Sequence, residues 1–290
     1  MRFAYFLGCT IPARANSYDA AARQVASKLD IELIPIEGAT CCPPVSIRSL
    51  DFKSWITIAA RNLALVEQMG LDVVALCNGC YGTLKDANHI LRMNEQLRNE
   101  VNGTLEGLGL KVEGVREVKQ FTEVLCSDYA KQKLLEKMTK KLEGLKVAVH
   151  YGCHLIRPSK IVQFDNPELP RKVDELVELT GAESIEYQNK LKCCGAPVLA
   201  VNEKLALELT KQKLLSAKKA GAHCIVTTCP FCGIQFDLFQ LKVEDLIKES
   251  IELPMLFLPQ LLGLSLGIEP KLLGLELHRV PFEIIEQIIG

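Results

Sequence analysis

Apolar residues recur along this chain in two rhythms, and both halves of the chain show them in the same order. Short runs of apolar residues, many of them β-branched, alternate with longer stretches whose apolar residues recur every three or four positions. The runs predict buried strands, and the longer spacing predicts amphipathic helices. The expected strands are 2–7, 32–36, 73–76, 145–150, 184–187 and 224–228, and the expected helices are 17–29, 52–69, 83–99, 169–180, 202–220 and 234–248.

Alternating strands and helices are typical of parallel sheets covered by helices on their faces. We therefore expect an α/β fold made of two pseudo-symmetric repeats, each with a parallel sheet flanked by helices. The expected divisions are a first half at 1–110, a helical linker at 111–144, a second half at 145–250 and a C-terminal extension at 251–290.

Composition narrows the class of protein. The chain has 290 residues and a net charge of −1, which does not favour nucleic-acid binding. The most apolar run, 254–268, is short and is interrupted by Pro259, Gln260 and Gly263, so it predicts a buried or partner-facing helix and no membrane span. The opening "MRFAYFLGCTIP" does not resemble a secretory signal, so we expect a cytoplasmic protein.

The twelve cysteines are the exceptional feature of the composition, and ten of them repeat at a fixed interval. Each set of five has a lone cysteine, a vicinal pair and a Cys-x-x-Cys motif. The second pair and motif lie 152 residues after the first, and the second lone cysteine lies 144 residues after the first, which indicates an internal duplication. The sets are Cys9, Cys41, Cys42, Cys77 and Cys80, and Cys153, Cys193, Cys194, Cys229 and Cys232.

Each group of cysteines follows a predicted strand. In open α/β sheets, ligands lie outside the carboxyl ends of the strands. The five cysteines of each half are therefore expected to converge there, and the duplication predicts two related sites that face each other across a pseudo-twofold axis.

The chemistry of these thiols favours metal binding over disulfides. Neighbouring Cα atoms lie about 3.8 Å apart, whereas a disulfide needs about 4.4–6.8 Å. Sulfur-only ligation selects iron–sulfur clusters or zinc, but zinc sites often use two Cys-x-x-Cys pairs, and each half has only one. Iron–sulfur chemistry is favoured, while zinc and thiol redox chemistry stay open.

The spacing C-x₃₁-CC-x₃₄-C-x₂-C, followed by C-x₃₉-CCG-x₃₄-C-x₂-C, resembles the duplicated CCG-domain proteins. The "FLGCTIP" opening and the first-half "CCPP" most resemble the B-subunit family of heterodisulfide reductase. That resemblance implies a non-cubane [4Fe-4S] cluster in each half, held by the five cysteines of that half. It also implies that Gly195 lets the backbone pass close to the inorganic core.

The same resemblance implies an oxidoreductase that reduces the disulfide of coenzyme M and coenzyme B to two thiols. Electrons would come from a flavin-containing partner, the family's A subunit, through a ferredoxin-like partner, its C subunit. An alternative within the CCG domains is an electron-transfer subunit of a lactate, glycerol-3-phosphate or succinate dehydrogenase complex, or a reductase of another disulfide. A zinc-stabilised scaffold is a third interpretation.

Other residues are candidates for this reaction. His154 follows a cysteine directly and could donate a proton, or could orient the loop. The substrate would be anionic, so the cations near the cysteine loops could bind it, although each is also an ordinary surface charge: Arg14, Arg48, Arg157 and Lys160. We expect the remaining side chains that attract attention to pack in the core or to form hydrogen-bonded structure: Cys126, Cys224, His150, Trp55, Phe236 and Phe239.

Overall fold

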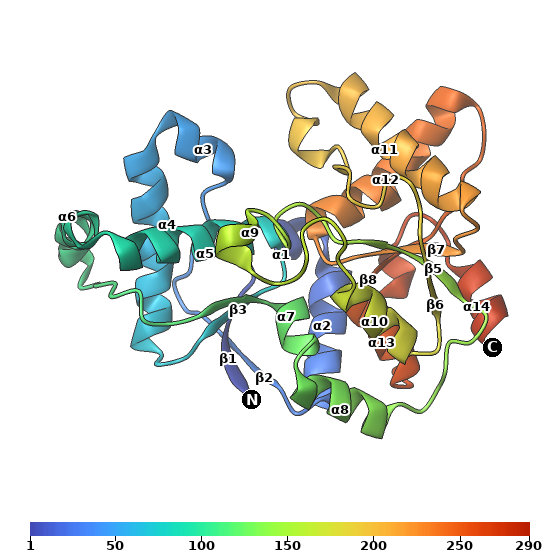
Figure 1. The fold of residues 1–290 in the computed structure, drawn as a ribbon, viewed down its shortest axis with the longest axis horizontal. Coiled ribbons are helices and arrows are strands. Elements are labelled where there is room, and N and C mark those ends of the chain that lie inside the picture. Colours follow the sequence, from blue (N-terminus) through green and yellow to red (C-terminus); the bar gives the residue numbers. More distant parts are fainter.

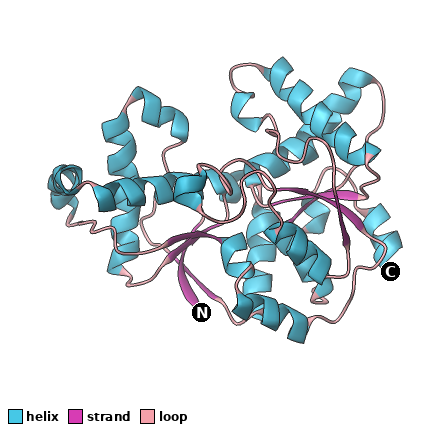
Figure 2. Ribbon diagram, viewed as in Figure 1, coloured by secondary structure: helices cyan, strands magenta, loops and turns pink.

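The computed structural model describes residues 1–290, with the side chains of all except Ile284 and Ile289. Two four-stranded parallel sheets, in the orders β2-β1-β3-β4 and β6-β5-β7-β8, lie side by side with helices around them (Figures 1 and 2). The α/β expectation with two pseudo-symmetric repeats is confirmed. The strands are β1 (Arg2–Phe6), β2 (Glu32–Pro35), β3 (Val73–Ala75), β4 (Val118–Gln120), β5 (Lys146–His150), β6 (Glu183–Ile185), β7 (Cys224–Thr227) and β8 (Met255–Phe257).

Helices cover both sheets, and several of them begin at the predicted positions (Figure 1). Those up to the second sheet are α1 (Thr10–Arg14), α2 (Asn16–Lys28), α3 (Val45–Leu50), α4 (Phe52–Gln68), α5 (Asn78–Met93), α6 (Glu95–Leu105), α7 (Phe121–Leu125) and α8 (Asp128–Lys137). Those that follow are α9 (Ser159–Val162), α10 (Lys172–Leu179), α11 (Glu203–Lys219), α12 (Pro230–Ile247), α13 (Leu258–Ser265) and α14 (Glu283–Ile289). Short 3₁₀ turns occur at 106–108, 196–198 and 275–277.

The strand register shows which positions of the two halves correspond. Phe6 on β1 pairs with Ala75 on β3, and His150 on β5 pairs with Thr227 on β7. Ala75 and Thr227 are separated by the same 152 residues as the cysteine motifs. His150 is therefore the structural counterpart of Phe6.

Helices α4 and α11 also correspond, because their ends are built alike. Asp51 and Asn202 cap the two helices by accepting a hydrogen bond from a backbone N–H of the first turn. Each helix is followed by a glycine in the left-handed region, Gly70 or Gly221, which terminates it. Both ends match at an interval of 151 residues, so positions along the two helices can be compared one by one.

Residues 111–144 differ from the helical linker expected from the sequence. They contribute β4 to the edge of the first sheet before α7 and α8 begin. Similarly, the 251–290 extension contributes β8 to the second sheet, and its helix α13 packs against α2 of the first half (Figure 1). Three-residue edge strands lack a strong sequence signal, and the pairing that defines them is non-local.

The core of the molecule is continuous across the two halves. Trp55, Phe236 and Phe239 are buried, as expected. The apolar 254–268 run is also mostly buried, as β8 and α13, where its side chains gain the free energy of leaving water. Within the part of the chain that the structure describes, no helix combines the length and apolar character needed to cross a membrane.

Candidate metal centre

The ten repeated cysteines lie at the carboxyl ends of the strands, as the duplication predicted. Cys9 follows β1, and Cys77 and Cys229 directly follow the central strands β3 and β7 and form the N-caps of α5 and α12. The sequence had predicted that these helices start later, at 83 and 234. Because they start at the Cys-x-x-Cys motif, each motif lies at the positive end of a helix dipole, which favours thiolates.

In the first half, the thiols are in mutual contact. Cys41 Sγ lies 3.3 Å from Cys9 Sγ. Burial and the hydrogen bond to Cys9 raise the pKa of Cys41 to about 12. A hydrogen bond with Cys80 lowers the pKa of Cys42, and bonds with Cys42 and Cys77 raise the pKa of Cys80. The five thiols therefore form one connected group.

The second half repeats this arrangement. Hydrogen bonds with Cys153 and Cys194 lower the pKa of Cys193 to about 2. The hydrogen bond from Cys193 raises the pKa of Cys194 to about 12, and a hydrogen bond with Cys194 raises the pKa of Cys232. These thiols cannot all ionise beside one another without a cation among them, so the group is suited to a thiolate-bound metal centre.

The two groups meet at the Cys-x-x-Cys motifs. A side-chain hydrogen bond with Cys229 raises the pKa of Cys77, and its partner's pKa falls through bonds with Cys232 and Cys77. The ten thiols thus form a single series that crosses from one half to the other. The two predicted sites are adjacent, with no separating wall of side chains between these two sulfur atoms.

The backbone behind this junction is fixed by buried side chains. Tyr18 donates from its hydroxyl to the carbonyls of Leu76 (3.2 Å) and Thr228 (2.9 Å), the residues directly before Cys77 and Cys229. The Gln120 amide donates to the same two carbonyls at 2.8 and 3.0 Å. One strand end from each half is thereby held at a fixed spacing, so the positions of the two motifs relative to one another do not depend on a ligand.

The residues present fit an iron–sulfur centre. All twelve cysteines are free thiols, and six of the ten repeated ones are buried. A Cβ at Gly8 would lie 2.7 Å from Cys80 Sγ, so glycine there keeps the space beside the thiols open. Five sulfur ligands per half exceed the four that zinc takes.

Gly195 has a different role from the one implied by the resemblance. Its φ is +99°, and a Cβ there would lie 2.4 Å from the Ala206 carbonyl oxygen of α11. The close approach is therefore between two segments of backbone, and it positions the Cys193–Cys194 loop against the helix.

His150 lies in the second-half site, where we expected packing or hydrogen-bonded structure. It is buried, and neither ring nitrogen has a hydrogen-bond partner of normal geometry among the described residues. One of its nitrogens lies within 4.8 Å of both Cys194 Sγ and Cys232 Sγ. Burial, and then the charge of Lys213, lower the pKa of His150 well below its usual value, so the ring is neutral.

His154 lies at the junction of the halves. Its side chain is half-buried and packs against Gly82 of α5, where a Cβ would lie 3.1 Å from His154 Nδ1. This brings His154 of the second half onto a helix that starts at first-half cysteines. Its proposed proton transfer stays a prediction.

The four candidate cations are dispersed. Arg48 is paired with Asp86 and lies over the Trp55 ring at 5.1 Å. Arg14 lines a cavity of about 200 Å³ beside α12, while Lys160 lines another of about 380 Å³ beside α5. Arg157 is exposed and donates to the Pro167 carbonyl at 2.9 Å. Their role in substrate binding also stays a prediction.

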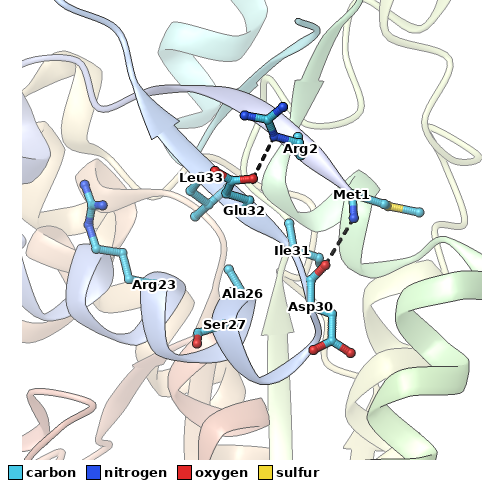
Figure 3. A pocket seen from close by; sticks show the side chains of 9 residues that line it. All are labelled: Met1, Arg2, Arg23, Ala26, Ser27, Asp30, Ile31, Glu32 and Leu33. Atoms are coloured by element: carbon cyan, nitrogen blue, oxygen red, sulfur yellow. Dashed lines mark hydrogen bonds and ion pairs between the residues drawn. The ribbon is translucent and has the colours of Figure 1, made fainter.

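The largest cavity, about 530 Å³, lies elsewhere (Figure 3). It is lined by residues around the start of β1, where Arg2 pairs with Glu32 at 2.7 Å and the N-terminal amine donates to the Asp30 carbonyl. The cysteines lie beyond the opposite, carboxyl end of β1, so this cavity belongs to a different face of the sheet edge.

Two cysteines lie outside the series of ten. Cys224 is fully buried in β7, and its pKa rises to about 12 through burial alone. Cys126 is half-buried and donates to the Lys172 carbonyl at 3.7 Å. Both pack as small apolar side chains, as expected.

The comparisons with known proteins agree with this duplication. The family model described as a cysteine-rich domain, CCG, matches residues 3–85 and again residues 147–237. A "hypothetical protein from Helicobacter pylori" shares the fold, with a TM-score of 0.81 at 19% identity. That match covers 97% of this chain and 52% of the Helicobacter chain, so this chain spans about half of that protein.

Two curated relatives match almost end to end. The B subunit of the "Ferredoxin/F(420)H(2)-dependent CoB-CoM heterodisulfide reductase" of Methanosarcina acetivorans is 40% identical, over 96% of this chain and 94% of its own length. The "8-methylmenaquinol:fumarate reductase membrane anchor subunit" of Wolinella succinogenes is 34% identical, over 96% of both chains.

Proposed function

The chain belongs to the B-subunit family of heterodisulfide reductase, with its duplicated cysteine-rich CCG domains, and from this premise we propose that it is a catalytic disulfide-reducing subunit. The proposed reaction is reduction of the coenzyme M–coenzyme B heterodisulfide to two thiols. The observation that carries it is the continuous series of ten thiols, in which the Cys77–Cys229 contact joins the two halves.

The proposed cofactors are two non-cubane [4Fe-4S] clusters, one for each set of five cysteines. When bound, they would supply the two electrons that cleavage of a disulfide needs, one from each half. Cys9, Cys41, Cys42, Cys77 and Cys80 would hold one, and Cys153, Cys193, Cys194, Cys229 and Cys232 the other.

The chain's own residues would align the substrate between the halves. Tyr18 and Gln120 fix the spacing of the two Cys-x-x-Cys motifs, so a disulfide bound at the junction would meet both sites at once. His154, at the same junction, would donate a proton to a departing thiolate. Arg14, Arg48, Arg157 and Lys160 would attract the anionic ends of the substrate.

The electron donors would be partner subunits. The Methanosarcina relative is by its name one subunit of a ferredoxin-dependent reductase, which supports a ferredoxin-like C subunit and a flavin-containing A subunit as partners here. A cytoplasmic location is also proposed, because twelve free thiols suit a reducing compartment.

A second candidate function is electron transfer alone. The Wolinella relative is named as part of a quinol:fumarate reductase, which favours a chain that passes electrons between other subunits without binding a disulfide. The two candidates share the clusters and differ in whether a small anionic disulfide reaches them.

The deciding experiment uses anaerobically purified protein. Iron and acid-labile sulfide are counted, and EPR spectra are recorded while the coenzyme M–coenzyme B disulfide is added. We expect about eight irons per chain and a new paramagnetic signal on addition of the disulfide. Eight irons without a response would favour the electron-transfer candidate, and zinc in place of iron would end both proposals.

A further inference from the structure

The two sites have the same five ligand types but different buried neighbours. His150 in the second half stands where the first half has Phe6, as the strand register shows. Lys213 on α11 stands where α4 has Asn62, because the two helices match at both ends at an interval of 151 residues. A donor and a cation in the second half thus replace a hydrocarbon ring and a neutral amide in the first.

Lys213 is placed to act on the second-half thiols. Its side chain is 1% exposed, and its ammonium donates to the carbonyls of Asn189 and Lys190, just before the Cys193–Cys194 pair. No carboxylate in the described part of the chain lies within salt-bridge distance of it. Burial lowers its pKa to about 8, and four second-half thiols oppose that shift, so it remains mainly charged at pH 7: Cys232, Cys194, Cys153 and Cys193.

Asn62 has the corresponding position but a different effect. It is also 1% exposed, and it accepts from the Thr40 backbone N–H at 2.9 Å, just before the Cys41–Cys42 pair. Both side chains therefore hold the loop of their vicinal cysteines, yet only the second-half side chain brings a charge into the interior. In the first half, the main influences on the Cys42 and Cys80 pKa values are other thiols and burial.

We propose that Lys213 and His150 make the second-half site the easier of the two to reduce. Adding one electron adds a negative charge, which a buried ammonium stabilises. The neutral His150 ring, with both nitrogens unpartnered beside Cys194 and Cys232, would donate its N–H to a ligand sulfur. Hydrogen bonds to the sulfurs and local charge both set cluster potentials, and both contributions raise the potential here.

Solvent exposure is the opposing effect. Cys9 and Cys41 are exposed, whereas Cys153 and Cys193 are half-buried, and water also stabilises added charge. The other three thiols of each half are buried, so this difference reaches only the rim of the first site. Lys213 and His150 act on the interior, where the dielectric is low and interactions are strong.

The test is a dithionite titration of anaerobically purified protein, followed by EPR, in which each site takes up one electron from the reductant. The wild type should show two midpoints, and Cys193→Ala should remove the higher one. Lys213→Gln should lower only the higher midpoint, by at least a tenfold change in the reduction equilibrium, about 59 mV for one electron. Lys211→Gln, on the exposed side of the same helix, should change neither midpoint.

His150 is tested with two variants. His150→Phe reproduces the first-half side chain and should also lower the higher midpoint, whereas His150→Gln keeps an N–H donor and should restore part of it. Weak ¹⁵N-histidine hyperfine coupling should disappear in His150→Phe while the iron count is retained. Loss of iron in that variant would instead make His150 a ligand and overturn the hydrogen-bond role.

The inference rests on the proposed function only in requiring a cluster in each half. Unchanged midpoints in both Lys213→Gln and His150→Phe, or a shift of the lower midpoint, would overturn it while leaving the cluster assignment intact. A wild-type protein without iron would overturn the proposed function itself, and the iron count distinguishes the two failures.

Discussion

The loop after the vicinal cysteines is built differently in the two halves. In the first half, Cys42 is followed by Pro43, whose carbonyl accepts from the Thr83 hydroxyl at 3.1 Å. In the second half, Cys194 is followed by Gly195, whose positive φ brings the backbone against Ala206. Duplication kept the spacing of the thiols, but each half secured its loop with a different contact.

The comparison teaches that ligand positions and ligand surroundings can diverge separately. The thiols need only sulfur at the right distance, and the strand ends supply that in both halves. The residues around them set access and charge, and there the halves differ: Cys9 and Cys41 are exposed, while Cys153 and Cys193 are half-buried.

The largest expected effect comes from removing one ligand in each half. Cys193→Ala should lose the second-half cluster, and Cys41→Ala the first-half cluster, so each should hold about half of the wild-type iron. Iron and sulfide counts check this. An unchanged count in Cys193→Ala would refute the ligand assignment, and complete loss in either variant would show that the halves assemble as one unit.

The next effect concerns the second-half loop. Gly195→Ala should lower the free energy of unfolding by about 3 kcal/mol, from the left-handed backbone and the clash with Ala206. Gly38→Ala is the control, because Gly38 also has a positive φ but has nothing near its Cβ, so it should cost about 1 kcal/mol. Denaturant unfolding measures both, and equal losses would mean that the Ala206 contact is unimportant.

A smaller effect is expected at the junction that the halves share. Tyr18→Phe removes the hydroxyl that donates to both Leu76 and Thr228, and should cost about 1–3 kcal/mol because buried carbonyls lose a partner. Tyr129→Phe is the matched control, since no hydrogen bond of that hydroxyl occurs among the described residues. If both variants unfold at the same denaturant concentration, the Tyr18 bridge does not stabilise the junction.

The smallest effect concerns recognition of the two ends of the substrate. Arg14 follows Cys9 and Arg157 follows Cys153, so each arginine would meet a different end of an asymmetric disulfide. Arg14→Ala and Arg157→Ala should each raise KM by about three- to tenfold with a smaller change in kcat. Lys248→Ala, an exposed lysine paired with Asp245, is the control. Kinetics unaltered in both arginine variants would exclude these residues from the site.

The sequence by itself determined the duplication, the fold class and the convergence of the ten cysteines. These follow from local patterns, because strand and helix periodicity and a fixed interval can be read without knowing any contact. A closer comparison of the repeats would also have placed His150 opposite Phe6, since both precede their lone cysteine by three residues.

Only the tertiary structure decided the rest. The edge strands β4 and β8, the start of α5 and α12 at the Cys-x-x-Cys motifs, and the Cys77–Cys229 contact depend on segments far apart in the chain. Whether a buried histidine or lysine faces thiols or carboxylates also depends on packing, which spacing along the sequence does not specify. His150 and Lys213 became candidates because folding buries them beside one set of thiols, where water cannot screen their effect.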